Sequence, residues 1–524
     1  MALSPACTCV SCPAHRGVPA APAGSAAAVP GLFAPAGELF GSVVAWLGGP
    51  VAGALDHAGL EERLVADARE LGRLLLQAHL DLRAAREERR AAVTGPDGIT
   101  RIRAESGHQR CLATLAGQVR VTRIAYRAPG APNVHLADAA LSLPAGRHTH
   151  GLQRLAAIEA TRGSFAAAAA AIGRAAGVPA GKRQVEELAR AAAADVDCFY
   201  ARGRPAPERA PASGVLGLSA DGKGIIMRPD ALRPRARAAA AKSHAKLATR
   251  LTRGEVRHRK RMAEVATVYD ITPAPRTPAA IITMPGEDPP RPAAPGPAAR
   301  GKWLTASVTA EIRQVIAAMF TEAARRDPGH ARPWVALVDG NPHQIRRIST
   351  EARHRATPVT IVIDFIHVLE YLWDTAWCFH PEADPAAEIW VATHARAILA
   401  GQASHVAATI RRAAQAAQLT GKRATTAGKC ARYLDTKQPY LNYEAALTAG
   451  WPITTGVIEG ACRHLVKDRM DITGARWSLP GAEAILKLRT VISNGDFDTY
   501  WTYHLIREHQ RNHPQPRTSY QLAA

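Results

Sequence analysis

The stretch Trp334-Val335-Ala336-Leu337-Val338-Asp339-Gly340-Asn341-Pro342 decides the class of fold. Its five apolar residues are too few for a buried helix, and Gly and Pro follow them at once. This pattern predicts a buried β-strand that ends at Asp339. A similar apolar run over residues 215–218 leads into Asp221-Gly222, and residues 225–227 resume it. We therefore expect residues 215–227 to form two strands of a hairpin.

Further strands and helices alternate along the chain after this point. Apolar runs at 265–269 and 359–363 predict two more strands, and the second of them ends at Asp364. Helical patterns cover 308–324 and most of 366–450, and a last long helix begins near Thr455 and carries Glu459. Strands that alternate with helices predict an α/β sheet covered by helices.

Asp221 and Asp339 both follow an apolar strand and precede a glycine. Beyond the end of a strand a carboxylate can face solvent while the strand stays buried, although Asp-Gly is also an ordinary turn sequence. Clustered carboxylates repel unless cations neutralise them, and Mg²⁺ (or Mn²⁺) prefers oxygen ligands. Two such ions about 3.5–4 Å apart can serve phosphodiester chemistry.

The charge of the chain points to a polyanionic partner. Its 66 Lys and Arg residues exceed its 45 Asp and Glu residues, which gives a net charge of +21. A membrane partner is not supported, because the apolar stretch 32–55 is interrupted by Glu38, Gly and Pro and has no basic leader. We expect one or two packed helices there, and a cytoplasmic, nucleoid-associated protein.

The N-terminal part has less specific patterns. Cys7, Cys9, Cys12 and His15 could hold zinc, but their first spacing is tight, and a disordered leader is the alternative. Apolar residues at helical spacing predict a long helix over 59–93, and alternation over 108–127 predicts a β-hairpin around Ala116-Gly117. Residues 1–58 are interpreted as a flexible or apolar leader.

Residues 164–200 have the pattern of a helix-turn-helix. Ser164 can cap a first helix that ends at Ala176, and Gly177-Val178-Pro179 breaks the chain. The second helix starts with three polar residues that could read DNA, namely Lys182, Arg183 and Gln184. Ordinary packing of an Ala-rich helix pair remains equally open. Residues 59–205 are thus expected to be a helical DNA-binding region with a small β-hairpin.

Four C-terminal motifs resemble those of one family. They are Gly456-Val457-Ile458-Glu459-Gly460, Leu465-Val466-Lys467-Asp468-Arg469-Met470, Thr473-Gly474-Ala475-Arg476-Trp477-Ser478 and Ala484-Ile485-Leu486-Lys487-Leu488-Arg489. Together with Asp221-Gly222-Lys223-Gly224, Val338-Asp339-Gly340-Asn341 and Asp364-Phe365-Ile366-His367, they resemble ISKra-type insertion-sequence transposases. These are DDE enzymes related to the Mutator-like and ISL-type transposases, and the resemblance runs from about residue 60 to 505.

The resemblance implies a fold and a set of roles. It implies an RNase H-like catalytic domain over 206–510, with a helical insertion at about 366–450 and a tail at 511–524. Asp221, Asp339 and Glu459 would hold two Mg²⁺ or Mn²⁺ ions, and water and then a freed 3′-OH would attack DNA. Asp364 competes with Asp339 as the second ligand, and the Asp364–His367 pair could instead position DNA or tune the ligands. That Asp364 only caps the start of a helix is an equally open alternative.

Two cationic residues follow Glu459 on its helix. Arg463 and Lys467 lie four and eight residues on, on nearly the same face, where they could bind phosphate. An internal Glu459–Arg463 ion pair is the alternative. Trp477 could stack on a base, although a buried Trp is more common at such a place. Assembly on two DNA ends implies a homo-oligomer. A structure-specific nuclease or resolvase of the same fold, or a degenerate copy that only binds DNA, remains an alternative.

Overall fold

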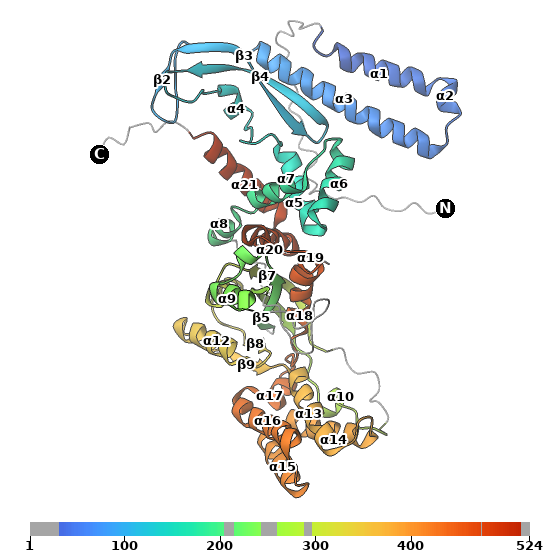
Figure 1. The fold of residues 1–524 in the computed structure, drawn as a ribbon, viewed down its shortest axis with the longest axis vertical. Helices are drawn as coiled ribbons and strands as arrows, with labels where there is room; N and C mark the ends of the chain where they lie inside the picture. The colour runs from blue at the N-terminus through green and yellow to red at the C-terminus, as the bar shows by residue number, and fades with distance from the viewer. Residues whose placement is uncertain (1–30, 204–213, 243–258, 288–295, 473, 515–524) are drawn as a thin grey trace. The chain divides into compact units, whose positions relative to one another are not determined.

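The computed structural model describes residues 31–203, 214–242, 259–287, 296–472 and 474–514 (Figure 1). It divides into two compact units, Met1–Leu112 with Ala116–Ala137 and Ala113–Leu115 with Asp138–Ala524. Cys7, Cys9, Cys12 and His15 lie outside the described residues. Within the described part of the chain, every helix is too short or too polar to span a lipid bilayer.

Among its described residues, the first unit combines helices with two two-stranded sheets. The expected hairpin over 108–127 is present as β3 and β4, whose connection passes through Gly117 at a positive φ of 127°. The long helix α3 ends at Ala85, earlier than predicted, and the charged residues that follow it are not helical. The elements are α1 (Ala34–Leu47), α2 (Pro50–Gly53), α3 (His57–Ala85), β1 (Val93–Thr94), β2 (Thr100–Arg101), β3 (Arg103–Thr114) and β4 (Gly117–Arg127).

The stretch 32–55 does form two helices, but the expectation that they pack their apolar residues is wrong. Of the side chains on α1 only Ala36 is buried, and on α2 only Ala52. Phe40, Val44 and Val51 are each more than half exposed. The apolar sequence predicted burial because burial usually stabilises such residues, yet no described element covers this face.

The second unit is built around one five-stranded sheet, which confirms the α/β class. Its strand order is β7-β6-β5-β8-β9; β5, β6 and β7 are antiparallel, whereas β5, β8 and β9 are parallel. One helix connects β7 to β8, and another connects β8 to its parallel neighbour β9, as a parallel pair requires. The strands are β5 (Val215–Ile226), β6 (Lys260–Thr272), β7 (Ala298–Ser307), β8 (Trp334–Val338) and β9 (Thr360–Ile363).

The hairpin expected within residues 215–227 is wrong, because β5 runs without a turn through Asp221-Gly222. It pairs with β6 from Val215 opposite Ile271 to Ile226 opposite Lys260. The glycines do not form a turn here; they allow side chains of β6 to lie close to the backbone of β5. A Cβ on Gly224 would lie 2.9 Å from Lys260 Cδ, and one on Gly222 would lie 3.1 Å from the end of Met262.

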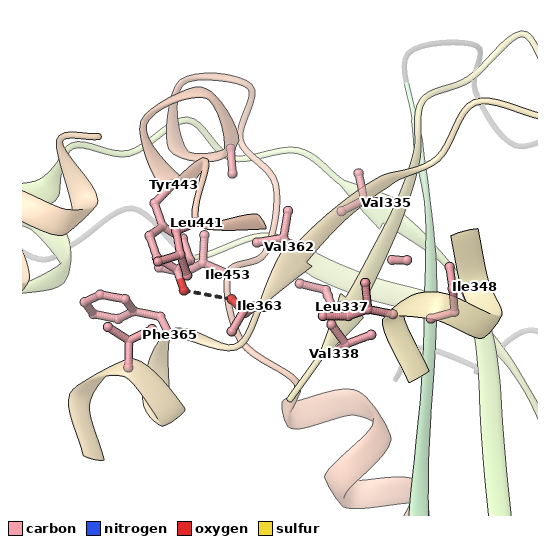
Figure 2. Packing of buried hydrophobic residues seen from close by; sticks show 14 of the residues in the cluster. Val335, Leu337, Val338, Ile348, Val362, Ile363, Phe365, Leu441, Tyr443 and Ile453 are labelled. Atoms are coloured by element: carbon pink, nitrogen blue, oxygen red, sulfur yellow. Dashed lines mark hydrogen bonds between the residues drawn. The ribbon is translucent and has the colours of Figure 1, made fainter. Parts of the chain in front are cut away.

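Hydrophobic clusters cover both faces of the sheet. Neighbouring residues of β6 illustrate the alternation, because Val265 belongs to one cluster and Ala266 to the other. Strand β8 is buried along its whole length. Figure 2 shows the packing beside β8 and β9, where the Tyr443 hydroxyl donates a hydrogen bond of 2.9 Å to the Ile363 carbonyl.

Among the described residues, the helices that lie between and after the strands of the second unit fall into three groups. Between the strands lie α9 (Pro234–Lys242), α10 (Pro278–Ile281), α11 (Ile312–Arg326) and α12 (Pro342–His354). The expected helical segment after residue 366 contains α13 (Phe365–Phe379), α14 (Pro385–Leu399), α15 (Ala403–Ala416), α16 (Gly421–Lys437) and α17 (Tyr443–Thr448). The last group is α18 (Gly456–Cys462), the π-helical turn η4 (Arg463–Lys467), α19 (Asp468–Met470), α20 (Leu479–Ser493) and α21 (Phe497–Asn512).

Helix α4 (Leu136–Ala140) spans the division between the units, and the four helices that follow it belong to the second unit. They are α5 (His150–Arg162), α6 (Phe165–Ala176), α7 (Lys182–Ala192) and α8 (Val196–Ala201). The Ser164 side chain caps α6 and Gly177 ends it in the left-handed conformation, as predicted. Because α5 and α7 pack on α20, the division between the compact units does not coincide with the expected boundary near residue 205.

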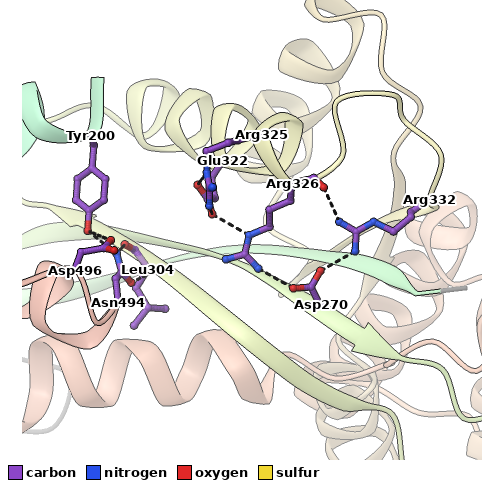
Figure 3. A network of polar contacts seen from close by, with 9 residues as sticks. All are labelled: Tyr200, Asp270, Leu304, Glu322, Arg325, Arg326, Arg332, Asn494 and Asp496. Atoms are coloured by element: carbon purple, nitrogen blue, oxygen red, sulfur yellow. Dashed lines mark hydrogen bonds and ion pairs between the residues drawn. The ribbon is translucent and has the colours of Figure 1, made fainter. Parts of the chain in front are cut away.

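One end of the sheet is fastened by paired charges, as Figure 3 shows. Asp270 on β6 accepts hydrogen bonds from Arg326 at 3.0 Å and from Arg332 at 2.7 Å. Glu322, which is 3% exposed, binds Arg325 and Arg326 at 2.8 Å. Asp270 and Glu322 therefore each have two arginine partners.

Candidate functional site

The opposite end of the sheet brings together three aspartates. The parallel pairing of β5 with β8 reaches Ser219 opposite Leu337, which places Asp221 and Asp339 at the same level two residues further on. Val338 pairs with Ile363, so Asp364 is level with Asp339. Adjacent strands lie about 4.8 Å apart. Asp221, Asp339 and Asp364 therefore form a row across three neighbouring strands.

Asp221 is half-buried within β5, and its carboxylate contacts the last helical group. Its Oδ1 accepts a 2.7 Å hydrogen bond from the amide of Gly222, and its Oδ2 lies 3.5 Å from Cys462 Sγ. Burial, together with the charge of Asp221, raises the pKa of the Cys462 thiol far above its usual range. The thiol is thus a neutral donor to the carboxylate.

Asp339 follows the last residue of β8, is partly buried, and uses one carboxylate oxygen in a turn. Its Oδ1 accepts a hydrogen bond of 2.8 Å from the Asn341 amide, and Gly340 adopts a φ of +88° that favours glycine. Asn341 in turn caps α12. The turn that the Asp-Gly sequence predicted is therefore present. It uses only one of the two carboxylate oxygens of Asp339.

Asp364 and Glu459 meet through a third residue that the sequence did not single out. Asp364 is 1% exposed, and its Oδ1 caps α13 by accepting the Ile366 amide at 2.9 Å. The buried Thr455 hydroxyl contacts Asp364 Oδ2 and also lies 2.9 Å from Glu459 Oε1. One hydroxyl proton can be donated to only one carboxylate at a time. Thr455 therefore couples the end of β9 to the helix that carries Glu459.

A cleft of about 760 Å³ opens at this end of the sheet, and Asp221 and Asp339 both border it. Asp364 and Glu459 are not among the residues that line it. The charged lining residues are four acids, Asp221, Glu264, Glu311 and Asp339, and four bases, Arg233, Lys260, Arg261 and Arg347. Such a lining suits a ligand that carries negative groups together with cations.

Glu264 is a carboxylate of the cleft that the sequence analysis missed. It lies opposite Gly222 across the β5–β6 pair. Burial raises its pKa, the charge of Arg233 opposes this, and the charge of Asp221 raises it further. No local pattern marks Glu264, because its place in the site depends on strand pairing.

The segment between β9 and α18 adds residues near Asp339. Burial lowers the pKa of His367, but its 2.9 Å hydrogen bond to Glu370 and the charges of Glu370, Asp364 and Asp339 raise it overall. The Tyr433 ring stacks on Tyr371 at 4.1 Å, and its buried hydroxyl has no hydrogen-bond partner among the described residues. Burial lowers the pKa of Lys437 while the charge of Asp339 opposes this.

The residues predicted to bind DNA stand on exposed helix surfaces. Lys182 and Arg183 begin α7, and the Arg183 side chain is 91% exposed and pairs with Glu187 at 3.0 Å. Gln184 is also exposed, but its Oε1 accepts the Gly181 amide at 2.9 Å and so caps the helix. The side chains of Lys182 and Arg183 are therefore exposed, whereas the Gln184 side chain caps the helix.

The geometry after Glu459 differs from a regular helix. Residues 463–467 form a π-helical turn, which alters the face that Arg463 and Lys467 share with Glu459. Arg463 lies 3.7 Å from Asp468, so the alternative of a Glu459–Arg463 ion pair is wrong. Trp477 is buried, its indole donates to the Met470 carbonyl, and Arg469 lies over its ring at 4.8 Å. The base-stacking role is thus not supported.

The carboxylate donors suit a hard divalent cation in their chemistry. As they are placed, no three His, Cys, Asp or Glu side chains of the described residues stand close enough together to hold an ion. A scan of the sequence against models of protein families finds no match, and a search of curated proteins finds none either. The function is therefore inferred from the placement of Asp221, Asp339 and Asp364 on adjacent strands.

Proposed function

We propose that this chain is a DDE transposase of the ISKra type, with an RNase H-like catalytic core. The observation that carries the proposal is the row of Asp221, Asp339 and Asp364 across adjacent strands, with Glu459 linked to it through Thr455. Three antiparallel strands followed by two parallel ones, joined by helices, are the arrangement expected of such a core. The +21 charge supports DNA as the partner.

Within this proposal, the cleft favours Asp339 over Asp364 as the second metal ligand. Asp339 borders the cleft beside Asp221, whereas Asp364 is buried and uses both oxygens within the protein. Asp221, Asp339 and Glu459 would hold two Mg²⁺ or Mn²⁺ ions. When bound, the ions would supply an activated water and would stabilise the leaving oxygen of a phosphodiester.

The remaining residues of the cleft would bind and orient DNA. Arg233, Lys260 and Arg347 are exposed and can contact phosphates of the strand that is cut. Arg261 donates to the carbonyls of Val308 and Ala231, so it holds the rim of the cleft in place. Lys182 and Arg183 on α7 would contact DNA further from the chemistry.

A strand-transfer assay tests the proposal. Purified protein is mixed with Mg²⁺ and labelled duplexes that carry the terminal sequences of the element that encodes it, together with a target plasmid. A joined product is the expected result. A cut product without joining would instead indicate a nuclease or resolvase, and a mobility shift without cutting would indicate a chain that only binds DNA.

A further inference from the structure

Helix α16 (Gly421–Lys437) presents a stripe of cations and hydroxyls to solvent. Its five members, which we call the α16 stripe, are all exposed, namely Lys422, Thr425, Lys429, Arg432 and Thr436. Their spacing of three, four, three and four residues places them on one face of the helix. The other side of α16 packs on α13 and α15, and its buried residues are Ala427, Cys430, Ala431 and Leu434.

The α16 stripe carries positive charge that the helix itself does not neutralise. Of the six charged residues of α16, five are basic, and Asp435 is the one acid. Asp435 lies off the stripe and pairs with Arg411 of α15. Lys429 lies over the Tyr371 ring at 5.4 Å, a contact that leaves its charge in place. The α16 stripe is therefore a surface that attracts a polyanion.

The C-terminal end of α16 lies beside the row of aspartates. A Cβ on Gly340 would lie 2.9 Å from the Tyr433 hydroxyl, and the charge of Asp339 acts on Lys437. This end of α16 is thus next to the end of β8. From Lys437 back to Lys422 the helix rises about 22 Å. The α16 stripe therefore begins near Asp339 and leads away from it along the helix.

The composition of the α16 stripe favours DNA phosphates over an anionic membrane. A helix that lies on a membrane carries apolar side chains beside its cations, and the stripe has none. Duplex DNA carries one phosphate charge about every 1.7 Å along its axis. A cationic helix face of this length can therefore contact several phosphates. Thr425 and Thr436 are short and uncharged, so a phosphate can approach the cations beside them.

We propose that the α16 stripe binds the phosphate backbone of the DNA segment that flanks the phosphate to be cut. This inference rests on the proposed function, because Asp339 marks where the reacting phosphate would lie. The residues that line the cleft do not include the stripe. The stripe would thus extend the DNA-binding surface beyond Arg233, Lys260 and Arg347, and would give the helical segment after residue 366 a role in holding the substrate.

Fluorescence anisotropy with a labelled duplex of arbitrary sequence tests the α16 stripe, on the full chain with EDTA so that nothing is cut. Between about 50 and 200 mM salt, Lys422→Gln combined with Arg432→Gln should weaken binding about tenfold and reduce the magnitude of the slope of log K against log salt by about 1.8, because two phosphate contacts are lost. Arg412→Gln combined with Arg423→Gln is the matched control. It removes the same charge from exposed positions off the stripe and should leave the slope unchanged.

The outcomes separate the α16 stripe from the proposed function. An unchanged affinity in the stripe variant, or an equal loss in the control variant, would overturn the stripe and leave the transposase proposal standing. Loss of binding to anionic phospholipid vesicles with an unchanged affinity for the duplex would also overturn it, because the stripe would then be a membrane-surface site. A natural chain that binds no duplex at all would overturn both proposals.

Photo-crosslinking tests where the DNA lies. With p-benzoylphenylalanine in place of Thr425, the cross-link should fall about five base pairs from the phosphate that is cut, because about 18 Å of helix separates residue 425 from Lys437. The same replacement of Arg423, which is exposed off the stripe, should give little cross-linking. Cross-links from Thr425 that spread evenly along the duplex would overturn the placement.

Discussion

The two ends of the central sheet treat their carboxylates in opposite ways. At one end, Asp270 and Glu322 are held by Arg325, Arg326 and Arg332. At the other, Asp221, Asp339, Asp364 and Glu459 bond only to backbone amides, a hydroxyl and a thiol, and among the described residues no Arg or Lys pairs with them. Carboxylates that pair with arginine stabilise the fold, whereas carboxylates without a cationic partner can bind a metal cation.

The largest contrast is expected between Asp221→Asn and Asp270→Asn. Asp221→Asn should reduce cutting about a thousandfold, since the developing charge loses its stabilisation, and should leave the midpoint of thermal unfolding unchanged or slightly raised. Asp270→Asn should lower the free energy of unfolding by about 3 kcal/mol, because two arginines lose their partner. Cutting per folded molecule should persist. Both quantities can be read from one protein preparation, by cleavage of labelled DNA and by denaturant titration.

Two results would contradict the assignment of Asp221 to catalysis and of Asp270 to stability. Loss of fold in Asp221→Asn would mean that its carboxylate is structural. Loss of cutting in a fully folded Asp270→Asn would mean that the arginine-paired end of the sheet also takes part in the chemistry.

The second contrast lies within the row, between Asp339→Asn and Asp364→Asn. Asp339→Asn should abolish cutting as Asp221→Asn does, with DNA binding intact in a mobility-shift assay. Asp364→Asn keeps an oxygen that can cap α13, so its fold should survive. We expect it to lose about tenfold to a hundredfold in rate through misplacement of Glu459. An active Asp339→Asn beside an inactive Asp364→Asn would reverse the assignment of the second ligand.

Substitution of Thr455, which lies between Asp364 and Glu459, is expected to slow cutting by a smaller factor. Thr455→Val removes the hydroxyl between Asp364 and Glu459 at nearly constant volume, which should slow cutting by about tenfold and cost about 1–3 kcal/mol for the buried acceptor left unpaired. Thr455→Ser, which keeps the hydroxyl, should restore the rate. The rate at saturating DNA is the useful measurement, and equal rates for the Val and Ser variants would show that the hydroxyl does not position Glu459.

The sequence could predict the row but not its surroundings. Strand β8 is recognisable because its apolar run is uninterrupted, and Asp339 follows it directly, as Asp364 follows the strand expected at 359–363. Asp221 was expected at the end of a strand, whereas β5 continues through it. Strand β7 was missed, since its first half, Ala-Arg-Gly-Lys, lacks an apolar alternation. Thr455 and Glu264 join the site only through contacts between segments far apart in the chain, which leave no local pattern.

The smallest effect concerns Glu264, with Glu322 at the opposite end as its control. The raised pKa of Glu264 means that the folded protein favours its neutral form. Its contribution to stability is therefore present below its ordinary pKa and is lost as the pH rises through the raised value. Glu264→Gln should thus increase the midpoint of thermal unfolding at neutral pH, and this gain should vanish near about pH 4. Glu322→Gln should lower the midpoint at neutral pH instead, because two arginines lose their charged partner. If both substitutions destabilised the protein equally at neutral pH, the carboxylates at the two ends of the sheet would not differ in their electrostatic balance, and the physical basis for placing a cation beside Asp221 would be lost.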